Sequence, residues 1–159
     1  MHLSSVPPGI ERNAYLPLLR LADDSEAQIR SYYQTGDLYA FDDESRQTLG
    51  MVLVLPRGTG EVELKAVAIE PAHQGRGLGQ QMIKALLAEL HRAGLSRVIV
   101  GTGNCAIGQL AFYQKLGFRL STIERDFFSE ERGYPEGILE NGIPLRDMVW
   151  MDLQLPCHP

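Results

Sequence analysis

A glycine-rich loop, residues 74–79, stands between an apolar run of strand character, residues 62–69, and an amphipathic helical segment. Its three glycines let the backbone approach a ligand closely and turn successive N–H groups to the same side. A helix that begins directly after the loop adds unpaired N–H donors and the positive end of its dipole. Strand, loop and helix in this order predict an anion-binding site, with a plain tight turn as the alternative.

Two common nucleotide-binding patterns fail on this loop. A Walker loop ends in Gly-Lys-Ser/Thr, whereas Gly79 is followed by Gln80 and Gln81. A dinucleotide loop reads Gly-x-Gly-x-x-Gly, and here the third glycine comes one residue early. The pattern that remains is Gln-x-x-Gly-x-Gly.

Three segments together resemble the GNAT superfamily of acyl-CoA N-acyltransferases. They are the strand at residues 63–69, the loop at 74–79, and the Phe-Tyr-Gln-Lys-Leu-Gly-Phe segment at 112–118. Outside residues 61–118 the chain is similar to this family only in the order of its elements. The resemblance implies a single N-acetyltransferase domain over residues 1–159. It also implies that the acetyl group of acetyl-CoA, the co-substrate, passes to a primary amine by direct attack in a ternary complex, with no metal.

The hydrophobic periodicity predicts an α/β (α+β) chain with a mixed sheet and helices packed on it. Predicted helices cover residues 15–21, 25–33, 80–93 and 107–116, and predicted strands cover 38–41, 49–55, 62–69, 97–100, 118–123 and 147–153. The small residues at 101–104 are expected to form a loop. The resemblance implies a more specific architecture, a GNAT-like fold. This fold has a central mixed, mostly antiparallel twisted sheet of about six to seven strands, flanked by about four helices.

The resemblance implies that the loop and the strand before it hold acetyl-CoA. Loop N–H groups would wrap the pyrophosphate, and Arg76 would add a cation unless it is a solvated surface residue. The backbone of Val67 and Ile69 would pair with the pantetheine arm, in a slot where this strand diverges from the next. Asn104 would also reach pantetheine, although it lies nine residues before Tyr113, farther than in the usual family pattern. The implied cofactor-binding residues are Val67, Ile69, Gln74, Gly75, Arg76, Gly77, Leu78, Gly79 and Asn104.

Tyr113 lies where this family places the tyrosine that protonates the departing thiolate of CoA. A phenol, whose ordinary pKa is about 10, is a weak acid suited to that leaving group. The alternative is a half-buried aromatic residue on an amphipathic helix.

Glu63 is the candidate general base. Strict alternation along the strand puts Glu63 on one face with Lys65, Val67 and Ile69, and we expect that face to be open near Glu63. Its separation from Gln74 matches a catalytic glutamate in some branches of the family, and a carboxylate there can take a proton from the amine, directly or through water. The alternatives are a cross-strand partner for Lys65 and an exposed edge charge.

Composition excludes several classes of partner. The net charge of -5, from 20 acidic and 15 basic residues, argues against a nucleic-acid partner. No apolar stretch approaches the length of a membrane span, and no signal peptide is visible, so we expect a cytoplasmic protein that does not bind a membrane. The two cysteines, Cys105 and Cys157, have neither disulfide-framework nor metal-ligand spacing.

By the resemblance, residues 15–33 and 126–146 shape the site of the acyl acceptor. The second segment mixes acidic residues with Phe127, Phe128 and Tyr134, and would suit a small-molecule or peptide amine. A solvated loop and a contact in a homodimer are the alternatives for this segment. For the whole chain, the alternative to catalysis is a non-catalytic acyl-CoA-binding or sensing module.

Overall fold

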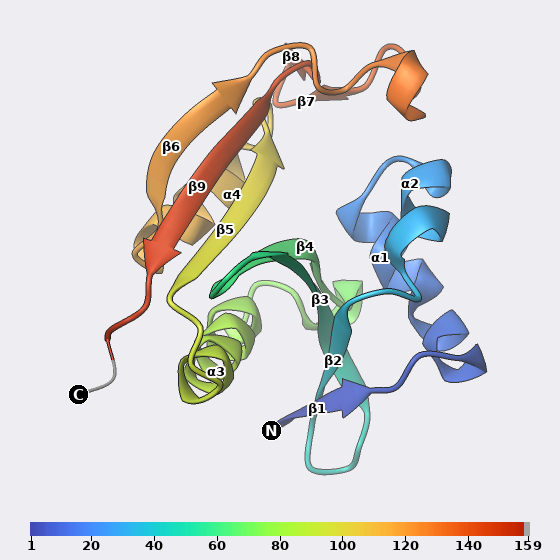
Figure 1. Ribbon diagram of the computed structural model, residues 1–159. Coiled ribbons are helices and arrows are strands. Elements are labelled where there is room, and N and C mark those ends of the chain that lie inside the picture. Colours follow the sequence, from blue (N-terminus) through green and yellow to red (C-terminus); the bar gives the residue numbers. More distant parts are fainter. Residues whose placement is uncertain (158–159) are drawn as a thin grey trace.

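Seven strands build the central sheet of this computed structural model, which describes residues 1–157. They are β1 (His2–Val6), β2 (Asp37–Asp42), β3 (Thr48–Gly58), β4 (Glu61–Ile69), β5 (Arg97–Gly103), β6 (Arg119–Glu124) and β9 (Met148–Gln154). Their order across the sheet is β1-β2-β3-β4-β5-β9-β6 (Figure 1). Every neighbouring pair is antiparallel except β4 and β5, which run parallel. This confirms the predicted mixed, mostly antiparallel sheet; the last two residues of the predicted domain lie outside the described range.

Four α-helices pack on the two faces of the sheet within the described residues. They are α1 (Leu16–Ala22), α2 (Glu26–Tyr32), α3 (Leu78–Arg92) and α4 (Ile107–Lys115), joined by the short 3-10 helices η1 (Ile10–Tyr15), η2 (Pro71–His73) and η3 (Glu130–Arg132). Helices α1 and α2 cover one face, and α3 and α4 the other (Figure 1). The four predicted helices are confirmed. A small hairpin of β7 (Leu139–Glu140) and β8 (Ile143–Pro144) lies apart from the main sheet.

Strand β3 serves two hydrophobic cores, one on each face. Met82 and Leu86 of α3 share one core with Val52 of β3. Leu19 of α1 shares the other core with Met51, the neighbour of Val52 on the same strand. Successive strand residues point to opposite faces, so a continuous apolar run fills both cores. Each fully buried side chain of this kind contributes about 1.5–3 kcal/mol.

Three parts of the sheet lie outside the predicted strands: β1, the end of β3 at residues 56–58, and the end of β5. In β1 only Val6 is buried, so this edge strand has no apolar alternation from which to predict it. The end of β5 includes Gly101, although small residues there predicted a loop; that prediction is wrong for residues 101–103. A Cβ on Gly101 would stand 2.6 Å from the sulfur of Met148. Glycine therefore lets β5 pass beside the large side chains of β9.

A β-bulge interrupts β4 at Lys65. Leu64 pairs with Val54 of β3, but the next paired residue, Ala66, faces Leu53. Lys65 is thus the one extra residue on β4, and a bulge of this kind re-aims the side chains beyond it.

The bulge exchanges the faces of the two halves of β4. Val62 and Leu64 share the α3-side core with Val67 and Ile69, whereas strict alternation would put these pairs on opposite faces. The prediction that Glu63 shares a face with Val67 and Ile69 is therefore wrong. Glu63 points to the opposite face, toward α1 and α2, where its charge acts on Tyr32.

A buried arginine fixes the N-terminal part of the chain. Arg12 is 1% exposed, and its guanidinium donates hydrogen bonds of 2.9–3.2 Å to the carbonyls of Val6, Tyr33, Thr35 and Gly36. These carbonyls lie at the end of β1 and between α2 and β2. One cation thereby joins β1, η1 and the connection from α2 to β2.

We expect Arg12→Met to lower the free energy of unfolding by about 3 kcal/mol, because several carbonyls at this buried position lose a charged donor. Urea denaturation followed by circular dichroism measures the change. Arg92→Met is the control, since Arg92 is exposed and pairs with Glu89 on the same helix. Equal denaturation midpoints for the two variants would contradict the role given to Arg12.

Candidate active site

Strands β4 and β5 separate part-way along their length. Their parallel pairing runs from Glu61 with Arg97 to Leu64 with Val100 and then stops, although β4 continues to Ile69 and β5 to Gly103. The slot that the resemblance implies is therefore present. Among residues 1–157, no strand pairs with the β5-side edge of β4 beyond the bulge, and an extended chain with amide groups can pair with such an edge.

The glycine loop presents free backbone donors next to this slot. Within the described residues, the N–H groups from Gly75 to Gln80 make no hydrogen bond. Gly75 and Gly77 have φ angles of +77° and +74°, which only glycine adopts without strain. Gly77 is the N-cap of α3, and the first turn of that helix carries no acidic residue. The loop and the helix dipole together favour an anion at this place.

The residues of the predicted glycine loop have different structural roles. A hollow of about 370 Å³ is lined by Gln74, Gly75, Gly77, Leu78 and Gly79, together with His73 and Phe112. Gln74 donates a hydrogen bond of 3.0 Å to the carbonyl of Ile69 and so ties the loop to the end of β4. Arg76 is exposed and does not line the hollow.

Gly79 has a packing role. A Cβ at this position would stand 3.2 Å from the ring of Phe112, so glycine lets α3 approach α4 closely. Phe112 in turn lines the hollow in front of the loop.

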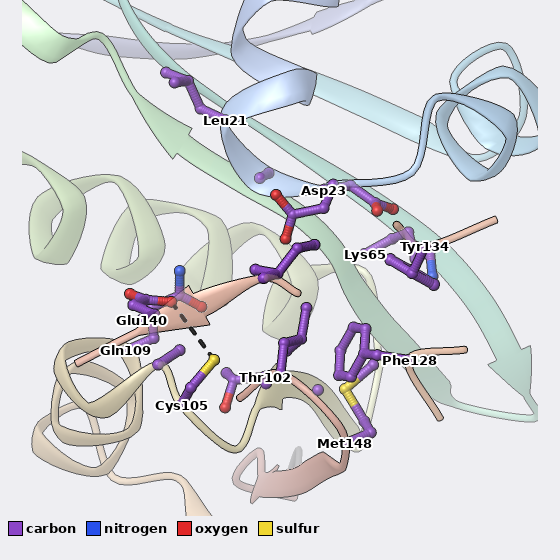
Figure 2. A pocket seen from close by; sticks show the side chains of 17 residues that line it. Leu21, Asp23, Lys65, Thr102, Cys105, Gln109, Phe128, Tyr134, Glu140 and Met148 are labelled. Atoms are coloured by element: carbon purple, nitrogen blue, oxygen red, sulfur yellow. Dashed lines mark hydrogen bonds between the residues drawn. The ribbon is translucent and has the colours of Figure 1, made fainter. Parts of the chain in front are cut away.

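A cavity of about 220 Å³ opens where β4 and β5 separate (Figure 2). Its walls come from the end of α1, from Lys65 at the bulge, from residues 101–103 of β5, from the start of α4, and from the late segment between Phe128 and Met148. Both chain segments expected to shape the acceptor site contribute to it. Lys65 and Gln109 also line the cavity, and the sequence did not single them out for it.

Asp23 organises one wall of the cavity. Its carboxylate accepts hydrogen bonds from the Ser25 N–H at 2.9 Å and from the Tyr32 hydroxyl at 3.1 Å. Burial, and then the charge of Asp23, raise the pKa of Tyr134. Because Tyr134 belongs to the late segment, this carboxylate joins that segment to α1 and α2. Gln28 of α2 adds a second link, because its side-chain amide donates a hydrogen bond of 3.1 Å to the carbonyl of Arg132, the last residue of η3.

Tyr113 is 4% exposed and lies in the core on the α3 side. Its ring packs edge-on against Phe112 and Phe118, with centroid distances of 5.0 and 5.5 Å. Among the described residues its hydroxyl has no hydrogen-bond partner. Burial raises the pKa of Tyr113, so the phenol stays protonated.

Glu63 is 2% exposed, so the expectation of an open face is wrong. Its partner is Arg57 of β3, whose guanidinium bonds both carboxylate oxygens at distances including 2.7 and 3.2 Å. Lys65, the partner considered from the sequence, instead places its ammonium 5.2 Å from the ring centroid of Tyr32. Glu63 does not line the cavity.

Asn104 holds the late segment in place. Its side-chain oxygen accepts hydrogen bonds from the N–H groups of Arg146 and Asp147 at 2.9 and 3.0 Å, and its amide donates to the Pro144 carbonyl at 3.1 Å. These three bonds engage both ends of the amide.

Two further residues of the cavity were not singled out as ligands from the sequence. Thr102 is 3% exposed and lines the cavity, and its buried hydroxyl finds no hydrogen-bond partner in the described part of the chain. Nothing in Gly-Thr-Gly distinguishes such a hydroxyl from an exposed one. The thiol of Cys105 also lines the cavity, 3.9 Å from a carboxylate oxygen of Glu140, and burial raises its pKa.

A model described as the Acetyltransferase (GNAT) family matches residues 11–118 of the sequence. The chain belongs to the GNAT family. The uncharacterized N-acetyltransferase YvbK of Bacillus subtilis (strain 168) is 37% identical over 138 residues, which cover 87% of each protein.

Two solved GNAT relatives share the whole fold. A Bacillus subtilis acetyltransferase in complex with CoA has a TM-score of 0.86 and 32% identity, covering 98% of this chain and 99% of its own. A GNAT family acetyltransferase from Elizabethkingia anophelis, with acetyl-CoA bound, has a TM-score of 0.85 and 32% identity, covering 96% and 98%.

Two negative observations concern the described part of this GNAT chain. None of its helices combines the length and the hydropathy needed to cross a membrane. Between residues 1 and 157, no group of three or more His, Cys, Asp or Glu side chains is arranged to hold a metal ion.

Proposed function

We propose that acetyl transfer takes place in the slot between β4 and β5, with the acyl donor on the α3 side and a primary amine on the cavity side. The protein is a GNAT N-acetyltransferase that uses acetyl-CoA as its co-substrate. The observation that carries the proposal is the end of strand pairing at Leu64 and Val100, which opens a slot bordered by both the glycine loop and the cavity.

The donor would be held mainly by backbone groups. We place its pyrophosphate on the free N–H groups of residues 75–80 and its pantetheine arm along β4 at Val67 and Ile69. The unpaired hydroxyl of Thr102 would give the arm a further hydrogen bond in the slot, since a buried hydroxyl without a partner is costly. Arg76 would reach the phosphates from the exposed side of the loop. Asn104 would act indirectly, by holding the late segment beside the cavity.

In the proposed reaction the nitrogen of the neutral amine attacks the thioester carbonyl carbon. A C–N bond forms, the C–S bond breaks, and the thiolate of CoA leaves with the electron pair of that bond. Tyr113 gives its proton to the thiolate, and the amine loses a proton through water to Glu63. Water is needed in this step because Glu63 does not line the cavity. Most of the acceleration would come from holding the two reactants together.

The acceptor is proposed at the level of its chemical class. We propose an amine, on a small molecule or a peptide, that enters through the cavity walled by Asp23, Tyr134 and the late segment. A location in the cytoplasm and a homodimer stay predictions from the sequence.

The loop assignment predicts that Gly77→Ala weakens acetyl-CoA binding at least about tenfold. A Cβ there projects into open space beside the hollow of the loop. Calorimetric titration with acetyl-CoA measures the affinity. Gly94→Ala is the matched control, because Gly94 also has a positive φ (+84°) and open space at its Cβ but lies after the far end of α3. If both variants lose stability equally and neither loses affinity, the pyrophosphate is not at this loop.

The proposed reaction predicts that Tyr113→Phe lowers kcat by about 10²-fold with little change in melting temperature. The variant removes one hydroxyl that has no partner and leaves the ring contacts intact. Release of CoA thiol with a panel of amines measures turnover. Tight acetyl-CoA binding without thiol release for any amine, in the unmodified protein, would instead favour the non-catalytic module.

A paired comparison tests Glu63. Glu63→Gln and Arg57→Gln break the same ion pair, but only the first removes the carboxylate. A base at Glu63 predicts a loss in kcat/KM of about 10²-fold or more for Glu63→Gln and a much smaller loss for Arg57→Gln. Equal losses of kcat/KM in the two variants would show that the ion pair supports the activity and that Glu63 is not the general base.

A further inference from the structure

Lys65 is the only cation among the described residues that line the cavity. Its position follows from the bulge, which places it on β4 at the point where β5 departs. Three carboxylates, those of Asp23, Asp24 and Glu140, line the same cavity. A lysine among carboxylates usually forms an ion pair, but no ion pair joins Lys65 to any carboxylate of the described residues.

An aromatic face holds the ammonium of Lys65 instead. The nitrogen stands 5.2 Å from the ring centroid of Tyr32, and the hydroxyl of Tyr32 is anchored by its bond to Asp23. A cation–π contact fixes the position of an ammonium without using its N–H donors. Lys65 therefore keeps its donors for a ligand in the cavity.

The other charges suit the amine end of such a ligand. The oxygens of Asp23 already accept bonds from Ser25 and Tyr32. Asp24 and Glu140 are exposed and have no cation partner among the described residues, so they can attract an incoming ammonium group. A second positive charge placed next to Lys65 would meet repulsion from its ammonium, whereas a carboxylate there would be attracted.

We propose that the acyl acceptor is an amine that also carries a carboxylate, of amino-acid size, and that Lys65 binds this carboxylate. The inference rests on the proposed acetyl transfer in this cavity. The cavity, of about 220 Å³, is smaller than the roughly 300–1,000 Å³ typical of sites for drug-sized ligands. Only the amine is acetylated; the carboxylate serves to orient it toward the thioester.

Matched acceptors test the proposal. Thiol release is measured for several amino acids and for their carboxamides, and each pair gives a ratio of kcat/KM values. In Lys65→Met, which keeps most of the apolar stem and removes the ammonium over Tyr32, the ratio of acid to carboxamide should fall about ten- to hundredfold relative to the unmodified protein. Comparing ratios between variants cancels the intrinsic difference in amine reactivity within each pair. Lys65→Arg keeps the positive charge and should retain most of the preference.

Lys84→Met is the surface control, since Lys84 is exposed on α3 and does not line the cavity. A ratio that Lys65→Met leaves unchanged overturns the proposal. So does an unmodified protein that acetylates the carboxamides and not the acids, and in that case the acetyl transfer of the preceding section still stands. If neither the acids nor the carboxamides release thiol although acetyl-CoA binds, the carboxylate proposal and acetyl transfer to small acceptors are both overturned.

Discussion

The structure depends on the place where hydrogen bonding between two parallel strands ends. Strands β4 and β5 pair only as far as Leu64 and Val100, and the bulge at Lys65 begins at the next residue. In a continuous sheet the backbone groups beyond this point would be satisfied by a neighbour. Here they are left for a ligand, and the sheet gives up part of its own stability at the site of function.

The divergence of β4 and β5 also divides the site into two sides. On the α3 side lie the glycine loop, the start of α3 and Tyr113, all arranged around backbone donors and apolar packing. On the α1 and α2 side lie Lys65, Tyr32 and Asp23, where charges and hydroxyls dominate. The bulge decides which residues of β4 face which side, because it turns the residues beyond Lys65 to faces that strict alternation would not give them.

The elements that repeat an apolar pattern could be predicted from the sequence. Helix α3 and strands β3 and β4 have long periodic runs, and the loop between β4 and α3 carries its glycines in a recognisable order. Features that depend on neighbours could not be predicted. The bulge is a property of the pairing with β3, and the burial of Glu63 follows from Arg57 on that strand. The cavity combines α1, β4, β5 and the late segment, which meet only in the folded chain.

A crystal structure with acetyl-CoA bound would show whether the donor occupies the gap between β4 and β5. We expect the pantetheine arm to lie between these strands beyond Leu64, with its pyrophosphate on residues 75–80. We also expect a hydrogen bond from Thr102 to the arm and a CoA sulfur within hydrogen-bond reach of the Tyr113 hydroxyl. A complex in which β4 and β5 close the slot by pairing beyond Leu64, with acetyl-CoA bound elsewhere, would contradict this placement of the donor.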